Sequence, residues 1–338
     1  MEPNFTLYWI TATAGILLSG VLFVCLGKRG GFSPLRCAAG FLLGLALALL
    51  IAKGVYVCFY YSSLSPYGFG KWLRFVPKEF SFVSGAAGFC LGPVLVSLRR
   101  RKEIPSLLDF LAAPGCLLCA FLRFAEVFLG QLGLCDVYSL GLPDIAEGSF
   151  LARFPFAARD AWGVWYLSVS ALAALCALFI GLAAFLRPNN KKARPRAGLV
   201  FERAAFLLCA VRFFLELTRM ECLVFYFVHL DQALCAVVML GLLIRLSLRL
   251  RKAGKRFPVP ELILFLLFFA LNGVTQYAMD KPWKFRALFS EYTFRWLNEN
   301  LRWFGFALLL ATTAGCVLIY LRLWRRARHG CITPPADP

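Results

Sequence analysis

The sequence predicts an all-α polytopic membrane protein with about nine transmembrane helices, an N-terminus outside the membrane and a C-terminus in the cytoplasm. The first observation is composition: the 338-residue chain is 60% hydrophobic with a mean hydropathy of +0.71, whereas soluble domains are about 45–50% apolar. The second is that apolar runs of about 18 residues recur along the whole length. The third is that basic clusters follow every second run. No alternation typical of a β-barrel is visible.

The apolar runs divide the chain into its expected elements. The first run has no basic residues before it and Lys28 and Arg29 after it, which indicates a retained first helix rather than a signal peptide. The predicted spans cover residues 7–26, 37–60, 80–98, 107–130, 163–186, 198–217, 229–248, 258–279 and 303–323.

The connecting charges set the orientation. Basic clusters follow the odd-numbered spans, at residues 28–29, 99–102, 191–196, 249–256 and 325–328. By the positive-inside rule these loops are cytoplasmic. The net charge of +19 is therefore assigned to topology and to contact with anionic lipid head groups rather than to nucleic acid.

Composition also argues against metal and redox chemistry. Most of the 13 cysteines lie in apolar segments, where cysteine acts as a small hydrophobic residue. Cys116 and Cys119 form a C-x-x-C inside a predicted span, which favours packing over a redox or metal pair. Only two histidines occur, His229 and His329, so a histidine-rich metal site is excluded. We expect no cofactor.

Two outer loops are of interest. The longest, residues 135–162, mixes charged and aromatic residues and fits either an interfacial amphipathic element or an ordinary extracytoplasmic loop. The other, residues 281–302, is rich in Trp, Phe and Arg, which is typical of a belt at head-group depth.

Ionisable residues lie inside several spans, where each costs roughly 2.5–3.5 kcal/mol on insertion scales. Helical spacing pairs Arg123 with Glu126, and Glu216 with both Arg212 and Arg219. One reading is that these are structural ion pairs between helices. The other is that they line an interior site, in which arginines would suit a phosphate. The residues concerned are Lys53, Asp109, Arg123, Glu126, Glu202, Arg203, Arg212, Glu216, Arg219, His229 and Asp231.

The predicted topology places the arginines at one depth. Arg123 and Arg219 lie near the outer ends of the fourth and sixth spans, at the level of the outer head groups. We therefore expect a site for a phospholipid head that is reached laterally from the bilayer.

At these residues the chain resembles the prolipoprotein diacylglyceryl transferase family, collinearly over about residues 5–250. AKGVYVCFY in the second span resembles the family's G-R-x-G-Y-V-x-F-Y, and SFVSGAAG resembles its S-F-H-G-G-x-x-G. DFLAAPGCLLCAFLRFAEVFLGQLG stands where the family has D-x-x-A-P and R-x-G-N-x-x-N-x-E. RFFLELTR followed by HLDQALCAVVML resembles its R-F-x-x-E-x-x-R and M-G-Q-x-x-S-x-P-M, and Tyr8 matches a tyrosine of its first helix.

The resemblance implies a reaction, partners and a location. The family transfers a diacylglyceryl group from phosphatidylglycerol to the thiol of a lipobox cysteine in a preprotein, in the bacterial cytoplasmic membrane. It implies that Arg123 and Arg219 hold the phosphate, that Glu216 orients Arg219 or Arg212, and that Tyr8 contacts the lipid head. Further substrate-binding candidates are Lys53, Tyr56 and Gln131.

The chain also departs from the family's motifs. Val83 stands at the family's histidine, and Ala125, Glu126, Leu129 and Gln131 replace its glycine, two asparagines and glutamate. RDAWGVWY replaces the family's H-P-x-Q-x-Y-E. Because valine cannot accept a proton, Glu126 is the candidate base. The alternative is a catalytically inactive paralogue that binds anionic phospholipid or lipopeptide.

Three parts are expected along the chain. Residues 1–250 form the transferase-like membrane core, residues 251–323 form an additional two-helix membrane extension, and residues 324–338 form a cytoplasmic tail. The sequence of the extension suggests no chemistry.

Overall fold

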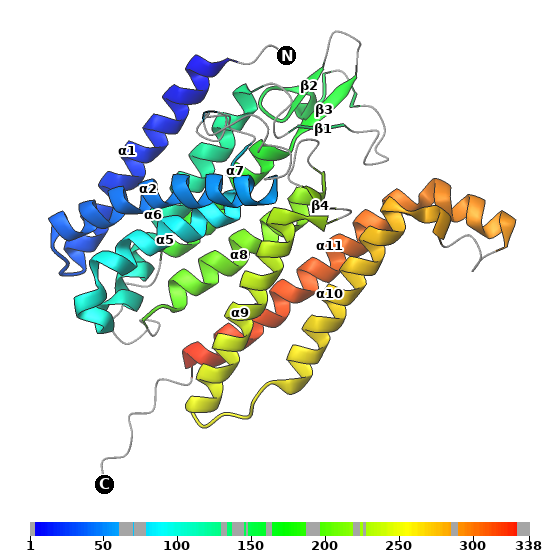
Figure 1. Cartoon of the computed structure of the whole chain (residues 1–338). Coiled ribbons are helices and arrows are strands. Elements are labelled where there is room, and N and C mark those ends of the chain that lie inside the picture. Colours follow the sequence, from blue (N-terminus) through cyan, green and yellow to red (C-terminus); the bar gives the residue numbers. More distant parts are fainter. Residues whose placement is uncertain are drawn as a thin grey trace.

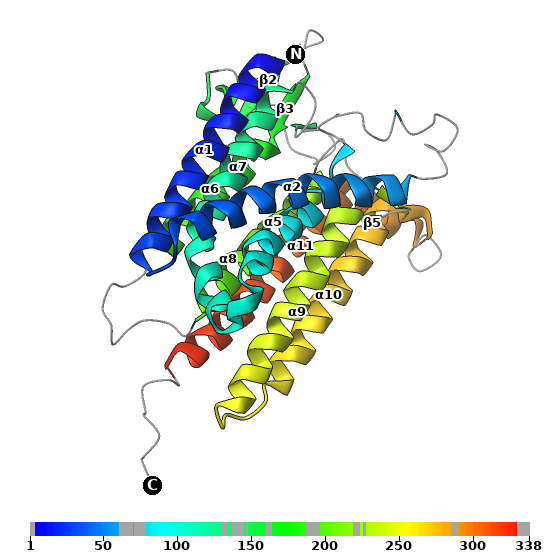
Figure 2. The ribbon, with the colours of Figure 1, turned by 60° about the vertical axis from the view of Figure 1, so that its left-hand side comes forward.

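The computed structural model describes residues 4–60, 70, 79–129, 134–136, 145–146, 148–159, 164–186, 197–218, 224–225, 228–284 and 290–329. Long helices make up most of this part of the chain (Figure 1). The N-terminal end of α1 lies beside a small β-sheet, and the C-terminal end of α11 lies at the opposite end of the molecule (Figures 1 and 2).

A helix occupies each of the nine predicted spans. The helices are α1 (Phe5–Arg29), α2 (Pro34–Phe59), α5 (Phe82–Val96), α6 (Ile104–Ala125), α7 (Val169–Phe185), α8 (Leu199–Leu215), α9 (Leu230–Lys252), α10 (Val259–Asp280) and α11 (Glu291–His329). Short 3-10 turns are η3 (Leu98–Glu103), η4 (Glu126–Phe128), η6 (Phe150–Ala152) and η8 (Glu216–Thr218).

Apolar length makes this a multi-pass membrane protein. Six helical segments of the described residues are long and apolar enough to cross a bilayer, at Phe5–Arg29, Pro34–Phe59, Leu98–Phe128, Leu230–Lys252, Val259–Met279 and Trp303–Arg328. Helices α5 and α7 are apolar but shorter. Helix α8 is also short, and it carries Glu202, Arg203 and Arg212, which lower its hydropathy.

Small strands interrupt the all-α pattern near the N-terminal end of α1. Strand β3 (Trp165–Ser168) pairs antiparallel with both β1 (Leu134–Asp136) and β2 (Ala157–Arg159). The fifth helix therefore begins at Val169, six residues later than predicted. The predicted boundary at 163 was wrong because Trp, Tyr and Leu suit a strand as well as an apolar helix. Strands β4 (Val224–Phe225) and β5 (Val228–His229) form a second ladder before α9.

Helices α2 and α5 pack through small residues. A Cβ at Gly92 would lie 2.2 Å from the Gly44 nitrogen and 2.4 Å from the Gly40 carbonyl oxygen, so the two backbones touch. Helices in a membrane associate through such close approaches because lipid gives little hydrophobic drive between them. Phe41 and Phe89 close the contact in a T-shaped pair with ring centroids 5.3 Å apart.

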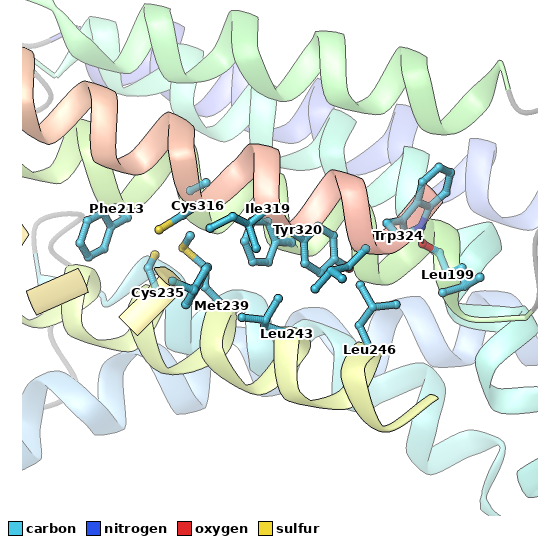
Figure 3. Packing of buried hydrophobic residues seen from close by; sticks show 14 of the residues in the cluster. Leu199, Phe213, Cys235, Met239, Leu243, Leu246, Cys316, Ile319, Tyr320 and Trp324 are labelled. Carbon is cyan, nitrogen blue, oxygen red and sulfur yellow. Dashed lines mark hydrogen bonds between the residues drawn. The ribbon is translucent and has the colours of Figure 1, made fainter. Parts of the chain in front are cut away.

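The C-terminal helices α10 and α11 pack onto α8 and α9 through a shared apolar core. The Tyr320 ring of α11 stacks on Phe206 of α8, with centroids 3.8 Å apart. Figure 3 shows Tyr320 between α11 and Leu243 and Leu246 of α9, in the same buried cluster as Trp324. Helix α11 continues to His329, so the first residues of the predicted tail are helical.

Candidate functional site

Candidate residues from distant parts of the chain meet where α6, α8 and α9 reach the end that carries β4 and β5. We call Arg123, Glu126, Arg212, Glu216 and Asp231 the outer charged layer, after the side of the membrane on which the predicted topology places Arg123. Arg123, Arg212, Glu216 and Asp231 are each less than 9% exposed. Because a buried charge is stable only when paired, the arrangement of partners decides what the layer can do.

Arg212 forms the centre of one half of the layer. Its Nη2 lies 2.6 Å from Glu216 Oε2 and 3.0 Å from Asp231 Oδ2. The first pair follows from the i, i+4 spacing on α8, and the predicted ion pair is confirmed. The second crosses from α8 to the first turn of α9. Within the described residues, the buried Nε of Arg212 has no hydrogen-bond partner.

Asp231 also binds the start of α5. Ser81 Oγ donates to Asp231 Oδ1 at 2.6 Å, and the Phe82 N–H donates to Oδ2 at 3.1 Å. Ser81 is the N-cap of α5, so Asp231 satisfies an N–H that the helix itself leaves unpaired. One carboxylate thus joins three helices: α5, α8 and α9.

Arg123 forms the other half of the layer with Glu126. Its Nη1 donates to both carboxylate oxygens of Glu126, at 2.7 and 2.8 Å, which confirms the i, i+3 pair. Ser170 Oγ at the start of α7 donates to Glu126 Oε2 at 2.9 Å. Tyr8 of α1 lies within electrostatic range of both Glu126 and Arg123.

The start of α1 is attached to the end of α6, which brings Tyr8 to this layer. The backbone N–H of Asn4 donates to the Phe128 carbonyl at 2.7 Å, and Asn4 Oδ1 accepts from the Leu7 N–H. The side-chain cap starts α1 at this level.

Phe82 connects the two halves. The Arg123 guanidinium carbon lies 3.7 Å from the centroid of the Phe82 ring, and that of Arg212 lies 5.4 Å from it. Both distances fall within the range of a cation–π interaction. The ring therefore contacts both guanidiniums and joins the two halves of the layer.

Lys53 and Tyr56 lie beside the same segment of α5. Lys53 Nζ pairs with Glu79 Oε2 at 2.5 Å and lies 5.0 Å from the Tyr56 ring and 5.4 Å from the Phe80 ring. Glu79 and Phe80 thus contact Lys53. The next two residues, Ser81 and Phe82, contact the outer charged layer.

Val83 provides no proton acceptor at the position of the family's histidine. Its side chain is 8% exposed and belongs to the apolar core of α8 and α9. The candidate base, Glu126, accepts hydrogen bonds from the Arg123 guanidinium and from the Ser170 hydroxyl.

Some predicted residues lie outside this arrangement. Arg219 and Gln131 fall outside the described residues. Asp109, expected with the other charges of its span, lies about 21 Å from Arg123 along α6 at 1.5 Å per residue. It accepts the N–H groups of Gly198 (2.7 Å) and Phe201 (2.9 Å) and so caps α8, which corrects the expectation that it lines the lipid site.

Sequence reasoning missed the partners that come from other helices. Ser81, Phe82, Ser170 and Glu79 are common residue types at ordinary positions, and only their neighbours give them a role. The sequence predicts Asp231 as a buried charge but does not assign it to the lipid site. Its position in the first turn of a helix is the one signal that the sequence offered.

Comparisons with known proteins add no relatives to this description. The chain matches no protein-family model, no curated protein and no solved structure. The described residues contain no group of three or more His, Cys, Asp or Glu side chains that could hold a metal ion.

Proposed function

We propose that this protein binds the phosphate of an anionic phospholipid, with phosphatidylglycerol as the expected lipid, and transfers its diacylglyceryl group to a lipobox cysteine thiol. The site is the outer charged layer, and the location is the outer side of a bacterial cytoplasmic membrane. The observation that supports the proposal is that Arg123, Arg212 and Glu216, three positions that match the family's motifs, meet at one buried layer, to which the start of α1 with Tyr8 is attached.

A buried hydrogen-bond donor without an acceptor supports the proposal that the ligand is a phosphate. The Nε–H of Arg212 has no described acceptor, and leaving such a donor unpaired costs about 1–3 kcal/mol or more. A phosphate oxygen would satisfy it, since guanidinium N–H groups match phosphate oxygens in geometry and charge.

The proposed transfer is balanced without an external reactant. The thiol sulfur forms a bond to the glyceryl carbon that carries the phosphate ester, and the bond from that carbon to the ester oxygen breaks. Glycerol phosphate leaves, and the thiol proton ends on its new phosphate oxygen. Arg123 and Arg212 would stabilise the charge that develops on this phosphate, which is the main contribution expected of a preorganised site.

The charges of the layer limit this mechanism. Its two arginines face three carboxylates, those of Glu126, Glu216 and Asp231. A phosphate that binds Arg123 must therefore compete with Glu126. Arg219 is the further cation that the resemblance implies.

A second candidate function is lipid binding without transfer. The buried Val83 favours it, because valine cannot accept a proton from a thiol and Glu126 is already bonded to Arg123 and Ser170. In this version the protein keeps the phospholipid site of the family and has lost its chemistry.

One experiment separates the two. Purified protein is incubated with phosphatidylglycerol and a lipobox peptide, and the chain is expressed in parallel in a bacterium depleted of its own transferase. Transfer predicts a thioether-linked diacylglyceryl peptide that is lost in Arg123→Ala and retained in Arg256→Ala, which removes an exposed cytoplasmic charge. No product, with phospholipid still bound in an Arg123-dependent manner, supports the second function. Lipid binding that is the same in folded Arg123→Ala contradicts both.

A further inference from the structure

A second group of cations lies at the other end of α8, where α11 packs against it. We call Arg203, Trp324 and Arg328 the inner basic cluster. Arg203 lies in the second turn of α8, and Trp324 and Arg328 lie near the end of α11. The cluster therefore joins the membrane core to the C-terminal helices, for which the sequence suggests no chemistry.

Trp324 is held in a fixed orientation. Its Nε1–H donates to the Leu199 carbonyl oxygen at 3.0 Å, and the residue is 6% exposed. Figure 3 shows Trp324 next to Leu199, at the end of the shared apolar core. The ring is thus a rigid platform between α8 and α11.

Two guanidiniums contact this platform. The Arg203 carbon Cζ lies 4.7 Å from the centroid of the Trp324 ring, and Cζ of Arg328 lies 5.9 Å from it. Because both guanidiniums contact one ring, their like charges lie close together and repel each other. An anion between or beside them would relieve this repulsion.

Arg203 differs from its neighbour Glu202. Glu202 Oε1 pairs with Arg245 and Arg249 of α9, each at 2.9 Å. No ion pair of the described residues includes Arg203, whose Nη2 donates a hydrogen bond to the Ala183 carbonyl oxygen at 2.9 Å. That bond caps the C-terminal end of α7, but it uses one of the five N–H donors of the guanidinium.

The cluster is open towards the bilayer. Ala183 is exposed, and the neighbouring Leu182, Phe185 and Leu186 of α7 are 51%, 48% and 67% exposed, as lipid-facing side chains are. The positive-inside rule places this end of α8 at the cytoplasmic head groups. Basic sites between helices at this depth bind anionic lipid heads.

We propose that the inner basic cluster binds the phosphate of an anionic phospholipid from the cytoplasmic leaflet, and that this lipid links the C-terminal helices to the core. The acyl chains would lie along the exposed apolar face of α7. The site is distinct from the outer charged layer, and the inference does not depend on the transfer reaction.

The test uses full-length protein that carries Arg123→Ala, so that the outer site does not contribute. Delipidated protein is titrated with dioleoylphosphatidylglycerol, dioleoylphosphatidylcholine or inorganic phosphate. Bound lipid is counted by native mass spectrometry, and the lipid concentration that gives half of the rise in Tm is measured. We expect phosphatidylglycerol to bind at least 10-fold more tightly than phosphatidylcholine.

Matched variants assign the binding to the cluster. Arg203→Gln and Arg328→Gln should each weaken phosphatidylglycerol binding at least 10-fold. Arg203→Lys should weaken it less, because the charge remains. Arg325→Gln, on the exposed side of the same helix, should have no effect. Circular dichroism confirms that each variant is folded.

Three results would overturn the proposal. The first is unchanged phosphatidylglycerol binding in folded Arg203→Gln. The second is equal binding of phosphatidylcholine. The third is an equal rise in Tm with inorganic phosphate at the same concentration, which would show that the ligand is a soluble phosphate rather than a lipid.

Discussion

The guanidinium carbon of Arg123 lies 3.7 Å from the centre of the Phe82 ring. This contact joins the end of α6 to the start of α5, and the same ring lies 5.4 Å from the Arg212 guanidinium. A side chain with no chemistry of its own therefore fixes the separation of the two cations in the outer charged layer.

Replacing Phe82 by Leu should lower stability and disturb this layer. A desolvated cation–π contact contributes about 1–2 kcal/mol, so we expect a loss of that size in the free energy of unfolding, measured by denaturant titration in mixed micelles. The matched control is Phe179→Leu on the lipid-facing side of α7, where Phe179 is 69% exposed. Equal effects of the two changes would show that the ring has no special role.

Asp231→Ala should be among the most destabilising single changes in the chain. The change removes one of the two carboxylates that pair with Arg212. It also removes the acceptor for the Ser81 hydroxyl and the Phe82 N–H. Breaking a buried ion pair costs about 3–5 kcal/mol. The control is Glu261→Ala, which breaks the pair with the 45%-exposed Arg326 side chain and should cost less than about 1 kcal/mol. A cost for Asp231→Ala as small as that of the control would contradict this account.

Glu126→Gln distinguishes two roles of this residue: neutralising the charge of Arg123, or acting as the base. The change keeps a hydrogen-bond acceptor for Arg123 but removes the competing negative charge. If Glu126 mainly neutralises Arg123, phosphatidylglycerol should bind about 10-fold more tightly, equal to about 1.4 kcal/mol. If Glu126 is the base, any thioether product should fall while binding holds. Lipid affinity in vesicles and product yield are measured side by side, and a loss of affinity would count against both roles.

Gly92→Ala should prevent the close approach of α2 and α5. The added carbon would lie 2.2 Å from the Gly44 nitrogen, and backbone cannot yield as a flexible side chain does. Overpacking of this kind costs about 1–3 kcal/mol. Gly241→Ala is the control because nothing lies within 4 Å of its added carbon. We expect a lower Tm for Gly92→Ala and an unchanged or higher Tm for the control.

Asp109→Ala should destabilise α8 without changing the outer charged layer. Loss of a side-chain cap costs about 0.5–2 kcal/mol, and here the carboxylate accepts two backbone N–H groups. Asp109→Asn, which keeps one acceptor, should recover part of the loss. Both variants should bind lipid at the outer charged layer with the affinity of the unchanged protein. A fall in affinity that exceeds the loss of folded protein would show that Asp109 contributes to that site.

The candidate site could be predicted only in part. The pairs within one helix, Arg123 with Glu126 and Arg212 with Glu216, follow from helical spacing alone. The partners Ser170 and Asp231 come from other helices, and no spacing along one helix can indicate them. The span of Asp109 shows the same difficulty. Its charges lie in one apolar run of the sequence, but Asp109 caps α8 at one end of α6 while Arg123 and Glu126 pair at the other.

The sequence by itself determined the order and approximate positions of the apolar helices and the side of the membrane predicted for each loop. These depend on local properties, which are the length of apolar runs and the position of Lys and Arg. The strand at Trp165–Ser168 escaped prediction because short apolar runs suit a strand or a helix equally.

Tertiary structure alone decided which charges meet. A buried ion must find its partner in three dimensions or pay for its desolvation, and helices distant in sequence supply most of the partners here. Asp231 therefore belongs to α9 by sequence but acts on α5 and α8, and Trp324, the first residue of the predicted tail, instead lies in α11 and donates a hydrogen bond to the core at Leu199. The sequence names the charged residues, and helix packing assigns each of them to a site.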